Sequence, residues 1–216
     1  MTGRSKTVQD GYDAIARTYH AGRLAREAAN QPFLDSVRSL LPQRGTLVDL
    51  GCGGGVPVTR YFSDRGYDVT GYDLSDEMLR IAREMVPGAR FERAAIEDIC
   101  LPALSLDVVV SFFAIIHVER SLHLGIFRRI HTWLRPGGAV LLSLGARNEP
   151  VRREENWHGA PMTWSHFDGE TNLELLRQCG FDVVWSEVEE WGGAEAHLFV
   201  VARKVATDPP AGGHLG

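Results

Sequence analysis

The sequence predicts a doubly wound α/β fold: a mostly parallel sheet of seven strands, closed by an antiparallel hairpin and preceded by an N-terminal helical cap. Three observations support this prediction. Short branched apolar runs alternate with helix-compatible segments across residues 46–203. A glycine-dense turn follows the first apolar run, at residues 51–55. The last two runs, 183–190 and 197–203, flank the sequence Trp-Gly-Gly-Ala, which is typical of a hairpin connection.

Residues 1–44 are predicted to form the helical cap. Tyr12, Ile15 and Tyr19 recur at helical spacing, and the segment 33–41 carries a second apolar helical face. We therefore expect helices that pack on the core that follows them.

Residues 45–204 are predicted to form the core, whose elements alternate along the chain. The apolar runs and their flanking residues place strands at 46–50, 68–73, 90–94, 106–112, 139–144, 183–190 and 197–203, with helices at 56–65, 76–85, 121–134 and 170–178. The segment 145–167, between the fifth strand and the last helix, is less regular. Residues 205–216 are rich in Pro and Gly, and we expect a disordered tail there.

The composition limits the classes of protein to which the chain can belong. At 216 residues it suits one α/β domain with a short cap, and its net charge of −5 offers no basic surface for nucleic acid. The cysteines Cys52, Cys100 and Cys179 form no C-x-x-C pair, which favours reduced thiols in a cytoplasmic protein without a metal site. The longest apolar run, 108–118, is too short to cross a membrane. We expect neither a nucleic-acid nor a membrane partner, and both a monomer and a homodimer remain open.

The segment 47–55, LVDLGCGGG, is the most informative part of the chain. Its apolar run is typical of a buried strand, and the four glycines let the backbone approach a ligand where a Cβ atom would collide. A helix-compatible segment follows, and the N-terminus of a helix offers unpaired N–H donors to a ligand. A second apolar run ends in Asp73, whose carboxylate can accept both ribose hydroxyl protons of an adenosine. This order of elements indicates a nucleotide-type cofactor site.

The glycine spacing distinguishes between adenosine cofactors. The dinucleotide fingerprint G-x-G-x-x-G/A requires a glycine or alanine at its sixth position. Val56 or Val58 stands there instead, depending on whether the count begins at Gly51 or Gly53. A carboxylate at Asp49, just before the turn, would repel a pyrophosphate but suits a ligand that carries an ammonium group. The pattern therefore favours S-adenosylmethionine over a nicotinamide or flavin dinucleotide.

These residues resemble the motifs of the class I S-adenosylmethionine-dependent methyltransferases, in particular their small bacterial single-domain branch. The resemblance runs from Tyr12 to Lys204 and is most specific at 48–55, 71–75 and 134–138. It implies a Rossmann-like methyltransferase fold, S-adenosyl-L-methionine as cofactor and S-adenosyl-L-homocysteine as product.

The resemblance also implies a set of cofactor-binding residues: Asp49, Gly51, Cys52, Gly53, Asp73, Leu74, Met78, Ala95, Ile96 and Tyr12. Within this set the glycines would pack on the methionine moiety, Asp49 would contact its amino end, and Asp73 would bind the ribose. Leu74 and Met78 would flank the adenine, with plain core packing as the alternative. For Asp73 the alternative is a cap on the next helix, and for Cys52 it is a small residue tolerated in the turn.

The chain departs from the family pattern after the third strand. The family usually carries there an acidic residue that accepts a hydrogen bond from the adenine amine, whereas this sequence has Ala95. Backbone groups of Ala95 and Ile96 are expected to pair with the adenine edge instead. Glu97 is an alternative partner, and a solvated loop acid is an equally compatible interpretation of that residue.

Methyl transfer from a sulfonium is an in-line displacement, so the protein mainly aligns a nucleophile about 3 Å from the methyl carbon. A base is needed only if that nucleophile arrives protonated. His166 is the first candidate, because the segment 156–166 holds two Trp and two His. His117, just after the strand at 106–112, is the second, and Tyr19 of the cap is a third. The alternatives are structural histidines and a tyrosine that anchors the cap.

We therefore expect a methyltransferase that acts on an oxygen or nitrogen atom of a small molecule, with secondary metabolites among the candidate acceptors. The alternative is a protein that binds S-adenosylmethionine without using its methyl group, as a cyclase, an eliminase or a sensing module. The segment 145–167 exceeds the usual ~2–6 residues of such a connection, and we expect a lid that walls the substrate pocket. A short helix packed on the cap is the alternative for this segment.

Overall fold

The computed structural model describes residues 3–25, 27–190 and 196–205, with the backbone alone at 27–30. The predicted hairpin turn at 191–194 and the tail residues 206–216 lie outside the described residues. No helix within the described ranges is both long and apolar enough to span a membrane.

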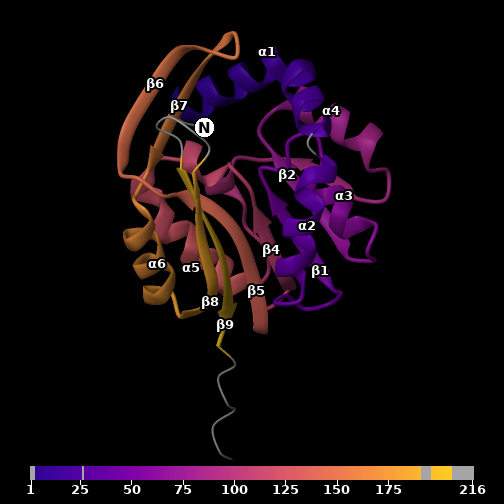
Figure 1. Ribbon diagram of the computed structural model, residues 1–216, viewed down its shortest axis with the longest axis vertical. Coiled ribbons are helices and arrows are strands. Elements are labelled where there is room, and N and C mark those ends of the chain that lie inside the picture. Colours follow the sequence, from indigo (N-terminus) through magenta and orange to yellow (C-terminus); the bar gives the residue numbers. More distant parts are fainter. Residues whose placement is uncertain (1–2, 26, 191–195, 206–216) are drawn as a thin grey trace, which may run out of the picture.

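Among the described residues, seven strands form one sheet in the order β3-β2-β1-β4-β5-β9-β8 (Figure 1). Strands β1 to β5 are parallel, and β9 lies antiparallel between β5 and β8. Their bounds are β1 Thr46–Leu50, β2 Asp68–Asp73, β3 Arg90–Arg93, β4 Leu106–Ser111, β5 Leu134–Gly145, β8 Phe181–Glu190 and β9 Ala196–Lys204. The predicted doubly wound sheet is confirmed. Its order reverses between β1 and β4, and open α/β sheets bind ligands beyond the carboxyl ends of strands at such a point.

Helices cover both faces of this sheet (Figure 1). The helix α5 and the helix α6 pack on one face, and α2 and α3 pack on the other. The helices and 3-10 turns are α1 Gly3–Ala25, α2 Glu27–Arg38, α3 Val58–Ser63, α4 Asp76–Met85, η1 Ile96–Asp98, η2 Ile115–His117, η3 Arg120–Leu122, α5 His123–Trp133 and α6 Gly169–Gln178. The helix α4 begins at the predicted residue because the Ser75 hydroxyl caps it, accepting from the Met78 N–H at 3.0 Å.

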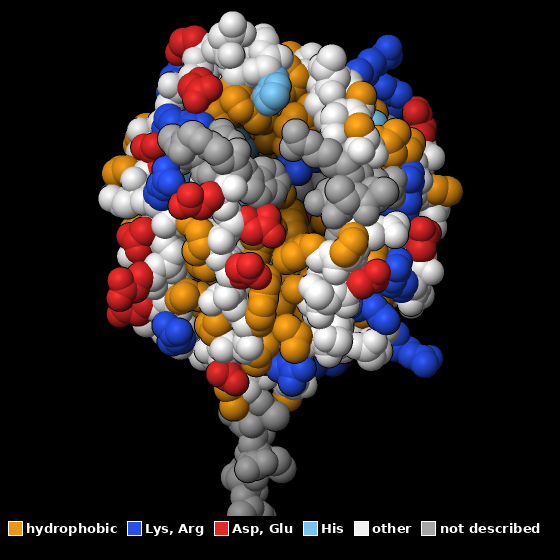
Figure 2. Space-filling view, viewed as in Figure 1, with side chains coloured by type: hydrophobic (Ala, Val, Ile, Leu, Met, Phe, Trp, Pro, Cys, Tyr) orange, Lys and Arg blue, Asp and Glu red, His pale blue; other side chains and the backbone are white. Residues whose placement is uncertain are grey.

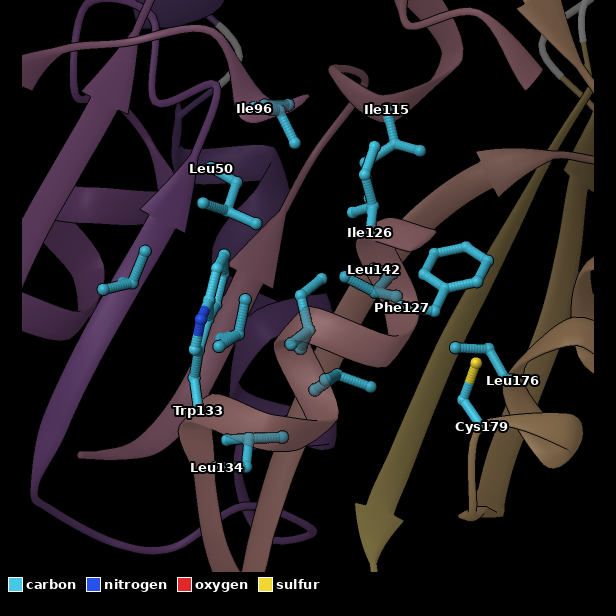
Figure 3. Packing of buried hydrophobic residues seen from close by; sticks show 14 of the residues in the cluster. Leu50, Ile96, Ile115, Ile126, Phe127, Trp133, Leu134, Leu142, Leu176 and Cys179 are labelled. Carbon is cyan, nitrogen blue, oxygen red and sulfur yellow. The ribbon is translucent and has the colours of Figure 1, made fainter. Parts of the chain in front are cut away.

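Neighbouring residues of the central strands supply two different cores. Val109 of β4 packs with α5 and α6, whereas Val108 and Val110 pack with α2 and α3. This division follows from the strand geometry, in which successive side chains project to opposite faces. Figure 3 shows the larger core, where side chains of α5 and α6 meet Leu50 of β1 and Leu142 of β5. The two cores hold the parallel strands in register, so their carboxyl ends form one edge.

Several element boundaries differ from the predictions, most of them by one or two residues. The helix α3 begins at Val58 rather than Val56, because the glycine turn continues through Pro57. The strand β5 begins at Leu134 rather than at residue 139, and residues 136–138 form an irregularity in its pairing with β4.

The segment 145–167 is more regular than predicted. It forms an antiparallel hairpin of β6 (Glu149–Trp157) and β7 (Ala160–His166), turning at His158 and Gly159, which both have positive φ. The prediction of an irregular segment and its alternative of a short helix are therefore wrong. The sequence obscures β6 because five of its nine residues are charged and none is buried, whereas most of β7 is buried.

The long helix α1 lies beside this hairpin and crosses the carboxyl edge of the sheet (Figure 1). Val8 of α1 packs with Met162 and Trp164 of β7, and the backbone of Gly11 lies so close to Pro161 that a Cβ atom would meet its carbonyl oxygen at 2.6 Å. Below α1, the same face of the molecule is hollowed and lined by apolar side chains (Figure 2). The hairpin therefore supports α1 above the edge where the glycine turn lies.

Candidate functional site

The glycine turn begins directly after β1. The N–H groups of Gly51 and Cys52 both donate to the carbonyl oxygen of Tyr72 at the end of β2, at 2.7 and 3.0 Å. At Gly51, a Cβ atom would lie 2.1 Å from the Cβ of Ala114, so glycine is required for packing. At Gly53, a Cβ atom would meet nothing within 4 Å. Gly51 thus brings two backbone segments together, and Gly53 leaves open space in front of the turn.

Asp73 connects the turn to the loop before α4. Its two carboxylate oxygens accept from the N–H of Gly53 at 2.8 Å and from the N–H of Ser75 at 2.9 Å. Burial raises the pKa of this carboxyl above its ordinary value, although both backbone donors oppose that shift. Each oxygen accepts one bond from the protein, so each retains capacity for a ligand hydroxyl. Because Ser75 caps α4, the alternative of Asp73 as the helix cap is not supported.

Asp49 is a buried carboxyl at the base of the turn. Only 2% of its surface is exposed, and its Oδ2 accepts from the Thr59 hydroxyl at 2.6 Å. Burial raises the pKa of Asp49 to about 7 because the carboxylate has lost most of its hydration. Within the described part of the chain it forms no ion pair. A cationic ligand group beside Asp49 would therefore be stabilised by it.

These groups line a cavity of about 270 Å³ that also reaches α1 and the end of β4. Of the predicted cofactor residues, nine line it: Asp49, Gly51, Cys52, Gly53, Asp73, Leu74, Met78, Ile96 and Tyr12. Ala95 does not line it, and its carbonyl accepts the N–H of Asp98 at 2.9 Å. The adenine contact expected of Ala95 is thus not supported by the geometry. Glu97 does line the cavity, where Ser5 of α1 donates to its Oε1 at 2.6 Å.

Tyr12 and His117 form a hydrogen-bonded pair in the wall of the cavity. The Tyr12 hydroxyl lies 3.0 Å from Nε2 of His117, whose Nδ1 lies 2.7 Å from the carbonyl oxygen of Thr163. A carbonyl only accepts, so Nδ1 carries the imidazole hydrogen and Nε2 accepts from Tyr12. Burial lowers the pKa of His117 to about 4, which keeps the ring neutral at physiological pH. Burial also raises the pKa of Tyr12 well above its ordinary value, so the phenol retains its proton.

His166, the first catalytic candidate of the sequence, lies elsewhere. It is not among the residues that line the cavity, and its ring packs against the backbone of Gly145. Its Nδ1 lies 2.9 Å from the carbonyl oxygen of Arg147 at the base of the hairpin. The geometry therefore reverses the predicted order of the two histidines and favours His117.

The hairpin is also placed differently from the lid that we predicted. No residue of 145–167 lines the cavity. Instead, the ring of Trp157 lies behind the cap tyrosines, with its centroid 5.7 Å from that of Tyr12 and 5.6 Å from that of Tyr19. The hairpin thus braces the residues of α1 that form the wall, because α1 lies between it and the cavity.

Several residues on the cavity wall carried no clear sequence signal. Arg23 shares the α1 face of the two tyrosines, at a spacing of four residues from Tyr19 that could have revealed it. Phe113 follows β4 with a φ of +57°, a conformation that its residue type does not predict. His20 packs against the backbone of Gly54 and thereby links α1 to the turn. The described residues contain no group of three or more His, Cys, Asp or Glu that could hold a metal ion.

The fold and this site together define a class of protein, the class I S-adenosylmethionine-dependent methyltransferases. A family model described as a methyltransferase domain matches residues 21–186. The chain belongs to this family, and S-adenosylmethionine is its cofactor.

Similar proteins agree with this assignment. A malonyl-[acyl-carrier protein] O-methyltransferase from Enterobacter lignolyticus (strain SCF1) is 32% identical over 125 residues, covering 57% of this chain and 49% of the relative. The chain matches between 28% and 59% of the length of these curated relatives.

Two solved structures share the fold. One is the Burkholderia thailandensis 1,6-didemethyltoxoflavin-N1-methyltransferase with bound 1,6-didemethyltoxoflavin and S-adenosylhomocysteine. It is 26% identical, with a TM-score of 0.65 over 92% of this chain and 91% of that chain. The other, a complex of DhpI with S-adenosylhomocysteine, has a TM-score of 0.75 at 22% identity, over 95% and 98% of the two chains.

Proposed function

We propose that this chain transfers the methyl group of S-adenosylmethionine to an oxygen or nitrogen atom of a small molecule. The observation that carries the proposal is the hydrogen bond between Tyr12 and His117, in the wall of the cavity that also contains the glycine turn and Asp73. The names of matched relatives support it, because they describe both O- and N-methyltransferases.

The residues of the turn suit the cofactor. Asp49 is a buried carboxyl without an ion pair among the described residues, so it would hold the cofactor ammonium group. The open space at Gly53 admits the methionine moiety, and Asp73 would accept from the ribose hydroxyls. Leu74 and Ile96 would contact the adenine ring. When bound, S-adenosylmethionine supplies a methyl group on a positively charged sulfur atom.

The tyrosine and the histidine would remove a proton from the acceptor. The Tyr12 hydroxyl donates its hydrogen to Nε2 of His117. The lone pairs of the Tyr12 oxygen therefore remain available to accept from the O–H or N–H group of the methyl acceptor. As the acceptor atom bonds to the methyl carbon, its proton passes to the Tyr12 oxygen and the phenol proton passes to Nε2. The Thr163 carbonyl holds the ring in place through Nδ1. Because a base with a pKa near 4 is weak at neutral pH, we expect a contribution near ~10², the lower end for general bases.

We propose further that the acceptor is a small molecule and not a nucleic acid, since the chain has a net charge of −5. The free thiols of Cys52, Cys100 and Cys179 support a cytoplasmic location. Monomer and homodimer both remain compatible with these features.

A labelling experiment tests the proposed reaction. The purified chain is incubated with a cell extract and S-adenosylmethionine that carries a radioactive methyl group, and the products are separated into small-molecule, protein and RNA fractions. We expect label in the small-molecule fraction, reduced ~10²-fold for Tyr12→Phe. Label confined to protein or RNA would overturn the acceptor class. Conversion of an acceptor in the presence of sinefungin, without a methylated product, would instead support a cyclase or an eliminase.

A further inference from the structure

One face of α1 carries two tyrosines and a cation toward the cavity. Tyr12, Tyr19 and Arg23 are separated by seven and four residues, which places them on one side of a helix. All three line the cavity, and the tyrosine rings meet edge to face with their centroids 5.4 Å apart. This face of α1 therefore presents two aromatic rings to the cavity and, at its C-terminal end, the guanidinium group of Arg23.

Side chains of the wall hold that guanidinium in a fixed place. Nε and Nη2 of Arg23 donate to the Tyr19 hydroxyl at 3.2 and 2.8 Å. Its Cζ lies 4.6 Å from the centre of the Phe113 ring and 5.2 Å from that of Tyr19. Planar guanidinium groups stack on aromatic rings in this way and so lose little additional freedom when a ligand binds.

The charge of Arg23 is not neutralised within the described part of the chain. It forms no ion pair with a described carboxylate, and no described residue accepts a hydrogen bond from its Nη1. A half-buried guanidinium with unused donors is suited to a carboxylate, which it can bind through two parallel hydrogen bonds.

We propose that Arg23 selects methyl acceptors that are planar aromatic carboxylates, with their reacting hydroxyl or amino group at Tyr12. This inference rests on the proposed function. The rings of Tyr12, Tyr19 and Phe113 provide aromatic surface along the cavity, and Arg23 binds the carboxylate at its far end. The distances from the Tyr19 ring to Tyr12 and to Arg23 limit the span between Tyr12 and Arg23 to about 11 Å. This span suits an acceptor of one or two rings.

Equilibrium binding of two probes of similar size and shape, one anionic and one neutral, tests this selectivity. The probes are 4-hydroxybenzoate and 4-hydroxybenzamide, titrated into the protein with and without saturating S-adenosylhomocysteine. We expect the wild type to bind the carboxylate at least tenfold more tightly than the amide. Arg23→Gln should remove this preference and Arg23→Lys should retain part of it, because lysine keeps the charge but not the two-pronged contact. Arg17→Gln, an exposed arginine of the same helix outside the cavity wall, is the matched control and should behave as the wild type.

The outcomes separate this inference from the proposed function. If the wild type binds both probes equally, or neither at millimolar concentration, the selectivity is overturned while cofactor binding stands. If Arg23→Gln instead weakens S-adenosylhomocysteine tenfold or more and Arg17→Gln does not, Arg23 holds the cofactor carboxylate and the inference is wrong. A wild type that fails to bind S-adenosylhomocysteine contradicts the proposed function. In that case the titrations of the two probes without S-adenosylhomocysteine still decide whether the protein prefers the carboxylate.

Discussion

The Tyr12 hydroxyl donates to Nε2 of His117 across 3.0 Å, although the two residues are 105 positions apart in the chain. Tyr12 comes from the helix α1, and His117 comes from η2 at the carboxyl end of β4. The β6–β7 hairpin contacts both partners of this hydrogen bond. Its residues Met162 and Trp164 pack against α1, and its Thr163 carbonyl accepts a hydrogen bond from Nδ1 of His117. The proposed proton-accepting pair therefore depends on three separate segments of the chain: α1, η2 and the β6–β7 hairpin.

Removing the phenol oxygen is expected to impair turnover more than cofactor binding. Tyr12→Phe should lower kcat ~10²-fold, since the acceptor loses its route to His117. His117→Gln should have a similar effect, because a glutamine can position Tyr12 but cannot take a proton. Tyr67→Phe is the matched control, as the Tyr67 hydroxyl bonds the Pro42 carbonyl outside the cavity. Single-turnover rates together with calorimetry for S-adenosylhomocysteine provide the measurement. Unchanged rates in both variants would remove the pair from the mechanism.

His166 is expected to stabilise the hairpin without taking part in the reaction. His166→Ala should leave kcat within about twofold of the wild type and lower the Tm, since Nδ1 then no longer bonds the Arg147 carbonyl. Thermal unfolding and turnover are compared in the same preparation. A loss of ~10² or more in rate at unchanged cofactor affinity would restore His166 as the base.

Cofactor affinity is expected to depend on pH through Asp49. In the free protein the pKa of Asp49 is about 7, so the carboxyl holds a proton below that pH. An ammonium group beside it requires the ionised form, so binding below pH 7 must release this proton. Affinity for S-adenosylhomocysteine should be level above about pH 7 and fall by up to tenfold per pH unit below it. Calorimetry in buffers of different ionisation enthalpy measures the proton released.

Asp49→Asn is the control for this pH dependence. It keeps an acceptor for the Thr59 hydroxyl but cannot ionise, so its affinity should be lower than that of the wild type at pH 8 and nearly constant between pH 5.5 and 8. A pH profile that is the same in both proteins would assign the dependence to another group.

Substitutions of two glycines of the turn, Gly51 and Gly53, are expected to affect stability and cofactor affinity differently. Gly53→Ala should fold with a cost of about 1–2 kcal/mol for its positive φ and weaken S-adenosylhomocysteine at least tenfold, because the new methyl group enters open space needed by the ligand. Gly51→Ala should lose more stability, since its Cβ overlaps Ala114. Gly125→Ala, in α5 with nothing nearby, is the control and should be neutral or stabilising. Wild-type affinity in Gly53→Ala would place the cofactor elsewhere.

Asp73 is expected to provide the ribose contact. Asp73→Ala should weaken S-adenosylhomocysteine by about ten- to a hundredfold, which corresponds to roughly 1.5–3 kcal/mol for lost charged hydrogen bonds. Asp76→Asn alters a neighbouring exposed carboxylate and should have no effect on affinity. Equal affinities of Asp73→Ala and the wild type, with both proteins folded, would contradict the assignment.

The sequence alone determined the sheet, its antiparallel closing strands and the cofactor, and it predicted nine of the residues that line the cavity. These features are local: β1, the glycine turn and β2 with Asp73 each follow from spacing over a few residues. Parallel strands then bring their carboxyl ends to one edge whatever the details of packing. The family assignment rests on the same local motifs, and it is confirmed.

The acceptor half depended on the tertiary structure. The two candidate histidines are distinguished by tertiary position: His117 lines the cavity, whereas His166 lies at the base of the hairpin. The charged strand β6 concealed the hairpin, since an exposed strand shows no apolar alternation. The spacing of Arg23 from Tyr19 is a local signal, but its place beside Phe113 in the cavity wall follows only from α1 lying across the sheet. Long-range packing of segments more than a hundred residues apart sets these positions, and no local pattern in the chain encodes it.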